Sequence, residues 1–261
     1  MSLYIFDLDG VIYRGERLLS GAKESLDLLR ERGEKVCFLS NNSTLSRRGY
    51  LRKLTRLGIR VSLEELFPSS YLAAVYFNRD RRREKSRLLV IGEEGLFEEL
   101  REAGVRIVQE ESEADYVVVG MDRNFTFGKL CQAYEAILNG AKFIATNTDS
   151  TYPLEEKTIP AAGAIVKAIE VSTGRMPLVL GKPEVFGLET ILKAKGCPRE
   201  EAIIVGDRLE TDILAGKRMG ITTVLVLSGI SRREDVERLS PSLRPDYIIP
   251  SLKDLPSLKL P

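Results

Sequence analysis

The chain has 261 residues, of which 30% are charged and 43% hydrophobic, and its net charge is +1. This balance is typical of a globular enzyme and gives no overall attraction to nucleic acid or to an anionic membrane. No apolar stretch approaches the roughly 20 residues of a membrane span, and the N-terminus runs directly into an apolar strand without a signal-peptide pattern. We therefore expect a cytoplasmic protein without nucleic-acid or membrane partners. The sequence leaves open whether the protein forms a homodimer.

The chain contains no histidine. This excludes histidine-dependent triads, histidine-ligated zinc and a histidine general base, so acid–base chemistry must use Asp, Glu, Lys, Tyr or Cys. The three cysteines, Cys37, Cys131 and Cys197, lack metal-ligand spacing, and we interpret them as buried or partly buried thiols in a reducing compartment. Lys, Arg and Glu are abundant while Gln occurs only at Gln109 and Gln132, a bias that predicts a thermophilic source.

Apolar periodicity predicts strands and helices that alternate along most of the chain. The predicted strands lie at residues 3–6, 35–39, 87–91, 105–108, 115–119, 142–145, 202–205, 221–227 and 247–249. The predicted helices lie at residues 22–31, 46–57, 93–103, 128–138, 162–172 and 184–195, with one more that ends at Met219. This alternation predicts an α/β fold with doubly wound parallel sheets, in which ligands bind beyond the carboxyl ends of the strands.

The alternation is interrupted between about residues 78 and 178 by a stretch with its own strands and helices. About a hundred residues are enough for a separate domain. We therefore predict a Rossmann-like core domain of residues 1–77 and 179–261 and an inserted α/β cap domain of residues 78–178. Within the predicted cap, residues 146–160 are expected to be irregular. The basic run at residues 79–85 is interpreted as a solvated helix end or hinge rather than a polyanion site.

Two aspartates, Asp7 and Asp9, follow the first apolar strand and flank Leu8. Residues i and i+2 of an extended segment face the same side, so we expect both carboxylates to converge on one patch. Two carboxylates at such a short distance repel each other unless one holds a proton or a cation lies between them. A hard divalent cation such as Mg²⁺ prefers oxygen ligands. Taken alone, the motif is equally compatible with a polar turn after a strand.

Further polar residues lie at comparable places. Ser40 and Asn41 follow the second strand, Lys182 is expected to open a helix, and Asp207 with Asp212 follows the strand at 202–205. A hydroxyl and backbone N–H groups ahead of a helix suit a bound phosphate, although Ser-Asn-Asn is also an ordinary loop sequence. Together these residues would supply carboxylates for a divalent cation, and a hydroxyl and an ammonium for an anion.

The order of these motifs resembles the haloacid dehalogenase superfamily of phosphohydrolases. The motifs are Asp-x-Asp-Gly at 7–10, Ser-Asn-Asn at 40–42, Gly-Lys-Pro at 181–183 and Gly-Asp-Arg-x-x-x-Asp at 206–212. The long interval between the second and third motifs is similar to the branch with a large α/β (C2-type) cap, which contains the nitrophenyl phosphatases and NagD-like, phosphoglycolate and pyridoxal phosphate phosphatases. The segments 119–122 and 145–149 also look like cap sequences of that branch.

The resemblance implies a role for each motif residue. Asp7 would be the nucleophile that forms an aspartyl-phosphate, and Asp9 would protonate the leaving group and then deprotonate the hydrolytic water. Mg²⁺ would bind the Asp7 carboxylate, the Asp9 carbonyl and Asp207. The phosphate-binding groups would be Ser40, Asn41 and Lys182.

Two further roles are implied. Asp212 would orient the metal shell or Lys182 from behind. In the cap, Asn147 and Asp149 would contact the leaving group and set substrate specificity, although both residues could instead only stabilise their own turn.

The expected function is Mg²⁺-dependent hydrolysis of small phosphorylated metabolites. The substrate could be a sugar phosphate, a nucleoside monophosphate, phosphoglycolate or pyridoxal phosphate, and the sequence does not choose among them. A phosphotransferase or mutase of the same superfamily is one alternative. A non-catalytic scaffold that binds a phosphorylated ligand is another, although the complete set of acidic residues argues against it.

Overall fold

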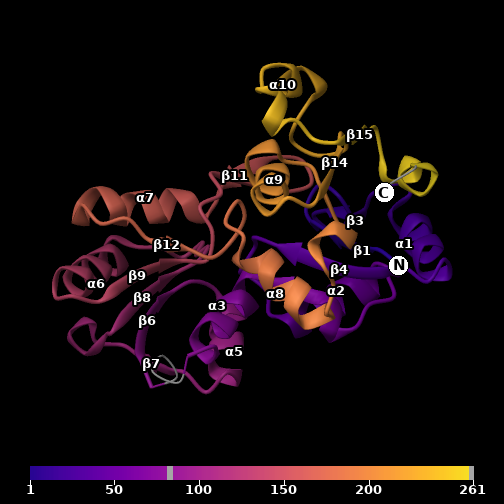
Figure 1. Cartoon of the computed structure of the whole chain (residues 1–261). Coiled ribbons are helices and arrows are strands. Elements are labelled where there is room, and N and C mark those ends of the chain that lie inside the picture. The colour runs from indigo at the N-terminus through magenta and orange to yellow at the C-terminus, as the bar shows by residue number, and fades with distance from the viewer. Residues whose placement is uncertain (81–84, 259–261) are drawn as a thin grey trace.

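The computed structural model describes residues 1–80 and 85–258. Two parallel sheets lie side by side, and the first and the last described residues lie at the larger one (Figure 1). The predicted α/β class with doubly wound parallel sheets is therefore confirmed. None of the helices in the described residues is long and apolar enough to cross a membrane.

The larger sheet has six strands in the order β15-β14-β13-β1-β4-β5, and all neighbouring strands are parallel. Its central strand β1 pairs on one side with β4 and on the other with β13, so Phe6 lies level with both Phe38 and Val205. The chain thus turns to opposite sides of β1, and the carboxyl end of β1 is the switch point where ligands bind in such sheets. The strands are β1 (Leu3–Phe6), β4 (Lys35–Ser40), β5 (Leu66–Pro68), β13 (Ala202–Gly206), β14 (Thr222–Val226) and β15 (Tyr247–Ile249).

Both faces of this sheet are covered by helices, because side chains alternate along each buried strand. Tyr4 and Phe6 of β1 point into one hydrophobic cluster, whereas Leu3 and Ile5 point into another. Helices α1 (Ala22–Glu31) and α2 (Arg47–Arg56) supply the first cluster, and α8 (Phe186–Lys195) and α9 (Leu214–Met219) supply the second. The short helix α10 (Arg233–Glu237) lies between β14 and β15 in the chain.

The smaller sheet has five parallel strands in the order β12-β9-β8-β6-β7. One face packs against α6 (Phe127–Leu138) and α7 (Ala162–Thr173), and the other against α3 (Ser69–Asn78) and α5 (Glu94–Glu102). The strands are β6 (Arg87–Ile91), β7 (Arg106–Val108), β8 (Tyr116–Val119), β9 (Lys142–Ala145) and β12 (Leu178–Val179).

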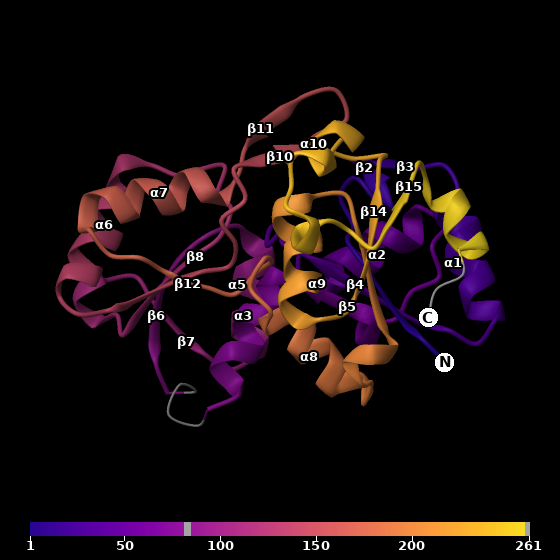
Figure 2. The same ribbon diagram turned by 45° about the horizontal axis from the view of Figure 1, so that its top comes forward.

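Two antiparallel hairpins were not expected from the sequence. The stretch 146–160, predicted to be irregular, contains β10 (Thr151–Pro153) paired with β11 (Thr158–Pro160). A second hairpin, β2 (Tyr13–Arg14) with β3 (Arg17–Leu18), follows the first aspartate motif. These strands have two or three residues, too few for an alternating pattern to identify them. In Figure 2, β10 and β11 reach from the side of the smaller sheet towards the larger one.

Three smaller expectations need correction or limits. Cys131 is exposed on α6, whereas Cys37 and Cys197 are buried as predicted. Lys182 does not open a helix, because α8 begins four residues later. Of the basic run 79–85, residues 81–84 lie outside the described residues. Its first residue, Arg79, donates to Thr190 Oγ1 at 2.7 Å.

Candidate active site

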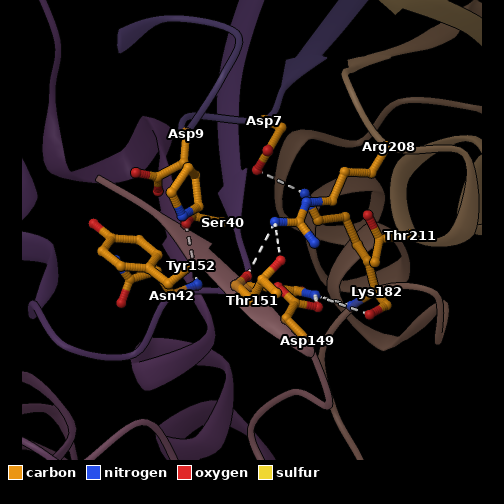
Figure 3. Close-up of a pocket in the computed structure, with 12 residues that line it drawn as sticks. Asp7, Asp9, Ser40, Asn42, Asp149, Thr151, Tyr152, Lys182, Arg208 and Thr211 are labelled. Atoms are coloured by element: carbon orange, nitrogen blue, oxygen red, sulfur yellow. Dashed lines mark hydrogen bonds and ion pairs between the residues drawn. The ribbon is translucent and has the colours of Figure 1, made fainter. Parts of the chain in front are cut away.

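A cavity lies at the carboxyl edge of the six-stranded sheet and is closed from the other side by the β10 segment (Figure 3). It brings together residues from every motif that the sequence singled out, together with residues of the inserted segment. The lining residues are Asp7, Asp9, Ser40, Asn41, Asn42, Asp149, Thr151, Tyr152, Pro153, Lys182, Arg208 and Thr211.

Lys182 is the cation at the centre of this cluster. Its Nζ donates to Asp212 Oδ1 at 2.6 Å, to Asp7 Oδ1 at 2.8 Å and to the Leu39 carbonyl at 2.9 Å, so all three N–H groups have acceptors. Burial alone would lower the pKa of Lys182, but the charges of Asp212 and Asp7 raise it above the ordinary value. Lys182 is therefore held as an ammonium group beside the Asp7 carboxyl.

Asp7 lies directly after β1 and is held in a fixed orientation by Lys182. Burial raises the pKa of Asp7 to about 7, the charge of Lys182 opposes this rise, and the charge of Asp212 adds to it. The ionised form of Asp7 is therefore stabilised chiefly by the charge of Lys182. Any further positive charge at the site would favour the ionised form.

Asp9 has two unlike oxygens. Its Oδ2 accepts a 3.4 Å hydrogen bond from the Tyr13 hydroxyl, and its Oδ1 is buried without a hydrogen-bond partner. Burial raises the pKa of Asp9 to about 6, while the charge of Lys53 and the nearby hydroxyls of Tyr152 and Tyr13 work against the rise. Asp9 lines the cavity, which places its carboxyl group beside any molecule bound there.

Asp207 lies at the end of β13 between two close glycines. A Cβ atom on Gly229 would come within 1.8 Å of Asp207 Oδ2, and one on Gly10 within 2.5 Å. The backbone therefore approaches this carboxylate more closely than any other residue would permit. Asp207 Oδ2 accepts from the Ile230 N–H at 2.8 Å, whereas its Oδ1 is buried and has no partner.

The donor set fits a hard divalent cation. Carboxylate oxygens of Asp7, Asp207 and Asp212 all lie within 4.8 Å of one another. Burial, followed by the charges of Asp7 and Asp212, raises the pKa of Asp207 well above its ordinary value, as expected where like charges converge without a counter-ion. The free Asp207 Oδ1 is the kind of atom that such a cation binds. Asp212 is already engaged, since it accepts from Lys182 and from the Arg208 N–H.

Ser40 and Asn41 form the edge of the cavity below β4. Ser40 Oγ accepts from the Asn42 N–H at 3.2 Å. The Asn41 side chain bonds the backbone of Lys182 twice, accepting from its N–H at 2.8 Å and donating to its carbonyl at 2.9 Å. We predicted a phosphate contact for Asn41, and the structure adds that its side chain fixes the Lys182 segment.

The two candidate specificity residues lie in different places. Asp149 lines the cavity, and its Oδ1 accepts from Asn41 Nδ2 at 2.8 Å. Asn147 is buried outside the lining, where its Nδ2 donates to the Asn41 carbonyl at 2.6 Å and its Oδ1 accepts from the Asp149 N–H at 3.1 Å. Asn147 thus shapes the segment that presents Asp149.

The sequence prediction gave no individual role to Arg208, and it included Tyr152 only as part of the segment 147–152 expected to contact the substrate. The guanidinium of Arg208 spans the cavity edge and donates to the Thr151 carbonyl at 3.0 Å, and Tyr152 lies beside Asp9 (Figure 3). Arg208 lies within the sequence motif that contains Asp207 and Asp212, and this place in the motif was the signal that could have indicated a role in the site. Its contact partner could not be inferred, because Thr151 is 57 residues away in the chain.

Comparison with known proteins agrees with this geometry. The model of haloacid dehalogenase-like hydrolases matches residues 4–106, and a second HAD-hydrolase-like model matches residues 179–255. The sugar-phosphatase AraL of Bacillus subtilis is 37% identical over 97% of this chain and 92% of its own length. The p-nitrophenyl phosphatase from Archaeoglobus fulgidus has a TM-score of 0.91 at 39% identity, over 98% of this chain and 99% of that chain.

A third similar protein is the glycerol phosphate phosphatase from Mycobacterium tuberculosis in complex with magnesium. Its TM-score is 0.89 at 31% identity, over 97% of this chain and 76% of that chain. The family matches cover the strands of the six-stranded sheet and the four sequence motifs, the first match reaches into the smaller sheet, and AraL matches through residues 78–178 as well. The chain therefore belongs to the haloacid dehalogenase-like hydrolases, among the phosphatases of the nitrophenyl phosphatase type.

Proposed function

We propose that this protein is an Mg²⁺-dependent phosphomonoester hydrolase that acts on small phosphorylated metabolites through an aspartyl-phosphate. One observation carries the proposal: an aspartate oriented by a buried lysine shares a cavity with a second aspartate that has a free oxygen. The three similar proteins described above, whose names denote phosphatases of small substrates, support the same class of reaction.

Asp7 is the proposed nucleophile. A carboxylate can attack phosphorus and form an acyl phosphate, and the absence of histidine removes the usual alternative. Lys182 bonds only Oδ1 of Asp7, and so orients the carboxylate without using its second oxygen in the contacts described. Ionised Asp7 and a phosphate group repel each other, and the ammonium group of Lys182 beside Asp7 reduces that repulsion.

Asp9 is the proposed general acid and base. It protonates the leaving oxygen when Asp7 attacks, and it then accepts a proton from the water that hydrolyses the acyl phosphate. Its buried free Oδ1 supplies the atom for both transfers. Ser40 and the Asn41 N–H are the proposed contacts to the phosphoryl oxygens, and Lys182 is the compensating cation.

Asp7, Asp207 and the Asp9 carbonyl would hold Mg²⁺, and Asp212 would keep Lys182 in place from behind. A bound ion would supply positive charge that offsets the charge of the phosphoryl oxygens. Phosphoryl transfer depends chiefly on such positioning and charge neutralisation.

We further propose that residues 78–178 form a cap domain on a core of residues 1–77 and 179–261. The five-stranded sheet lies within this insert apart from Val179 of β12, and β10 closes the cavity over the phosphate site. The catalytic residues of the core handle only phosphate and cation, so substrate choice falls to the insert, with Asp149 as the side chain in the cavity.

Phosphate release from p-nitrophenyl phosphate by wild type and Asp7→Asn tests the proposed function. The substitution keeps the shape of the side chain and removes its nucleophilicity, so we expect turnover to fall by at least about 10³-fold with an unchanged circular dichroism spectrum. Asp7→Asn activity within about tenfold of wild type would exclude the covalent mechanism. A wild type without any phosphatase activity, in the presence of Mg²⁺, would exclude the proposed function itself.

A further inference from the structure

We propose that Tyr13 and Lys53 are positioning residues for Asp9 and determine which of its oxygens exchanges a proton with the leaving group. This inference rests on the proposed function, in which Asp9 is the general acid. The geometry points to a chain of contacts that runs from Lys53 through the Tyr13 ring to one oxygen of Asp9.

The first observation is the inequality of the two Asp9 oxygens. Tyr13 holds Oδ2, and Oδ1 is buried without a partner in a side chain that lines the cavity. A carboxyl group rotates freely about its last bond unless one oxygen is held. At 3.4 Å the Tyr13 contact is longer than an ordinary O–H···O bond, and catalytic hydrogen bonds often tighten only when substrate is bound.

The second observation is that the backbone fixes Tyr13 relative to Asp9. The Gly10 N–H donates to the Tyr13 carbonyl at 2.8 Å, and Asp9 and Tyr13 form an isolated β-bridge. Tyr13 is fully buried, so its ring has no alternative position in solvent. The Tyr13 hydroxyl therefore lies next to Asp9, four residues earlier in the chain, and the loop between them is a rigid support.

The third observation is a buried cation on the face of the Tyr13 ring. Lys53 Nζ lies 3.9 Å from the ring centroid, and Lys53 is only 8% exposed. Lysine is rarely buried to this degree without a partner, and a cation over an aromatic face is attracted by the ring. The cation therefore helps to hold the ring whose hydroxyl contacts Asp9.

Charge balance explains why Lys53 is not neutralised locally. Its ion-pair partner Glu16, at 3.5 Å, is shared with Arg56, so two cations face one carboxylate. The group therefore retains one positive charge, and Lys53 Nζ holds it against the face of the Tyr13 ring. Lys53 and Glu16 also line a second cavity, which shares Tyr152 with the catalytic one, so this arrangement borders the space beside the phosphate site.

The test compares two substrates that need different amounts of general-acid help. An alkyl phosphate has a poor leaving group that requires a proton, whereas p-nitrophenolate leaves readily without one. For Tyr13→Phe and for Lys53→Met we expect kcat/KM to fall about tenfold or more on the alkyl phosphate and at most about threefold on p-nitrophenyl phosphate. The ratio kcat/KM covers only the steps up to leaving-group departure, so hydrolysis of the acyl phosphate does not contribute.

Arg48→Gln is the matched control. Arg48 lies on the same helix, but its side chain is exposed and its ion-pair partner is Glu102 at 3.0 Å, so the pairing of Lys53 with Glu16 is unchanged. We expect this variant to hydrolyse both substrates as wild type does. Tyr13→Phe removes one hydroxyl and Lys53→Met removes one charge while keeping the aliphatic stem, and thermal melting of both variants confirms that they fold.

The two outcomes are distinct. Equal losses of kcat/KM on both substrates in Tyr13→Phe and Lys53→Met would assign these residues to packing and overturn the inference, with the proposed function intact. If wild type hydrolyses neither substrate, the proposed function fails and the inference fails with it. A selective loss on the alkyl phosphate supports the inference, because a general disturbance of the fold does not depend on the leaving group.

Discussion

At the scale of single residues, the site concentrates negative charge around one lysine. Asp7 and Asp212 both bond Lys182, and Asp207 lies within the same group of carboxylates. Three carboxylates and one ammonium leave an excess of negative charge in a buried place, which is unfavourable without a counter-ion. A cation bound by the free oxygen of Asp207 would offset this excess. The excess of negative charge is therefore the physical basis of the proposed metal site.

The first residue-scale prediction concerns Gly229. In Gly229→Ala the new methyl group would lie 1.8 Å from Asp207 Oδ2, so the carboxylate must move. We expect the free energy of unfolding to fall by about 1–3 kcal/mol and the Mg²⁺ concentration for half-maximal activity to rise. Chemical denaturation and a Mg²⁺ titration measure the two effects.

Gly128→Ala is its control, because the added methyl group meets only Thr126 Oγ1 at 3.7 Å. We expect Gly128→Ala to keep or raise the stability, since alanine favours helix over glycine. Wild-type Mg²⁺ dependence in Gly229→Ala would show that Asp207 does not hold the cation.

At the scale of elements, the β10–β11 hairpin joins the inserted segment to the core. Arg208 donates to the Thr151 carbonyl at 3.0 Å, and the Glu16 N–H donates to Glu155 Oε1 at 3.0 Å. These polar contacts help to hold the hairpin against the core. A segment held in this way can open without disturbing either hydrophobic core.

Asn147 and Asp149 precede this hairpin and should differ in effect. Asn147→Ala removes three hydrogen bonds of a buried amide, so we expect stability to fall by about 1–3 kcal/mol and activity to fall alike on all substrates. Asp149→Ala alters the cavity, and we expect kcat/KM to change more for a sugar phosphate or glycerol phosphate than for p-nitrophenyl phosphate. Steady-state kinetics on both substrate types decide between these roles, and a selective effect of Asn147→Ala would contradict the division.

The elements also determine which thiols react. Burial raises the pKa of Cys37 to about 12, and burial followed by Glu201 raises the pKa of Cys197. The thiolate is the reactive form, so we expect iodoacetamide at pH 8 to modify only the exposed Cys131 in the native protein. Mass spectrometry gives the modified positions, and denaturant should expose all three cysteines. Rapid modification of native Cys37 would refute its placement in the sheet.

At the scale of the whole molecule, the metal should stabilise the fold as well as permit catalysis. A ligand that binds only the native state at about 100 times its Kd adds about 2.7 kcal/mol of stability. We therefore expect Mg²⁺ to raise the Tm relative to chelator, and activity to vanish in chelator and return with Mg²⁺. Ca²⁺ should inhibit, because its looser coordination spoils the geometry.

Asp207→Asn serves as the control for this measurement. Removing one carboxylate charge relieves repulsion in the metal-free state, so its Tm in chelator should equal or exceed that of wild type. Its response to Mg²⁺ should be lost. Coincident wild-type melting curves in chelator and in Mg²⁺ would argue against the metal site.

The sequence by itself determined the α/β class and the four motifs. Buried parallel strands form continuous apolar runs, and Asp7, Ser40 and Asp207 stand directly after such runs. Chain direction then places them at one edge, because the carboxyl ends of parallel strands meet there. These features depend on local pattern and on topology rules, which a single sequence contains.

Only the tertiary structure decided which partners meet across long intervals of chain. Arg208 meets Thr151, Asn41 meets Lys182, and the hairpin β10–β11 docks on the core, although none of these contacts has a local pattern. The same holds for Lys53, whose place over Tyr13 depends on how α2 packs against the first motif. Local periodicity determines which face of an element is buried, whereas the packing of distant elements determines the partners of each polar group.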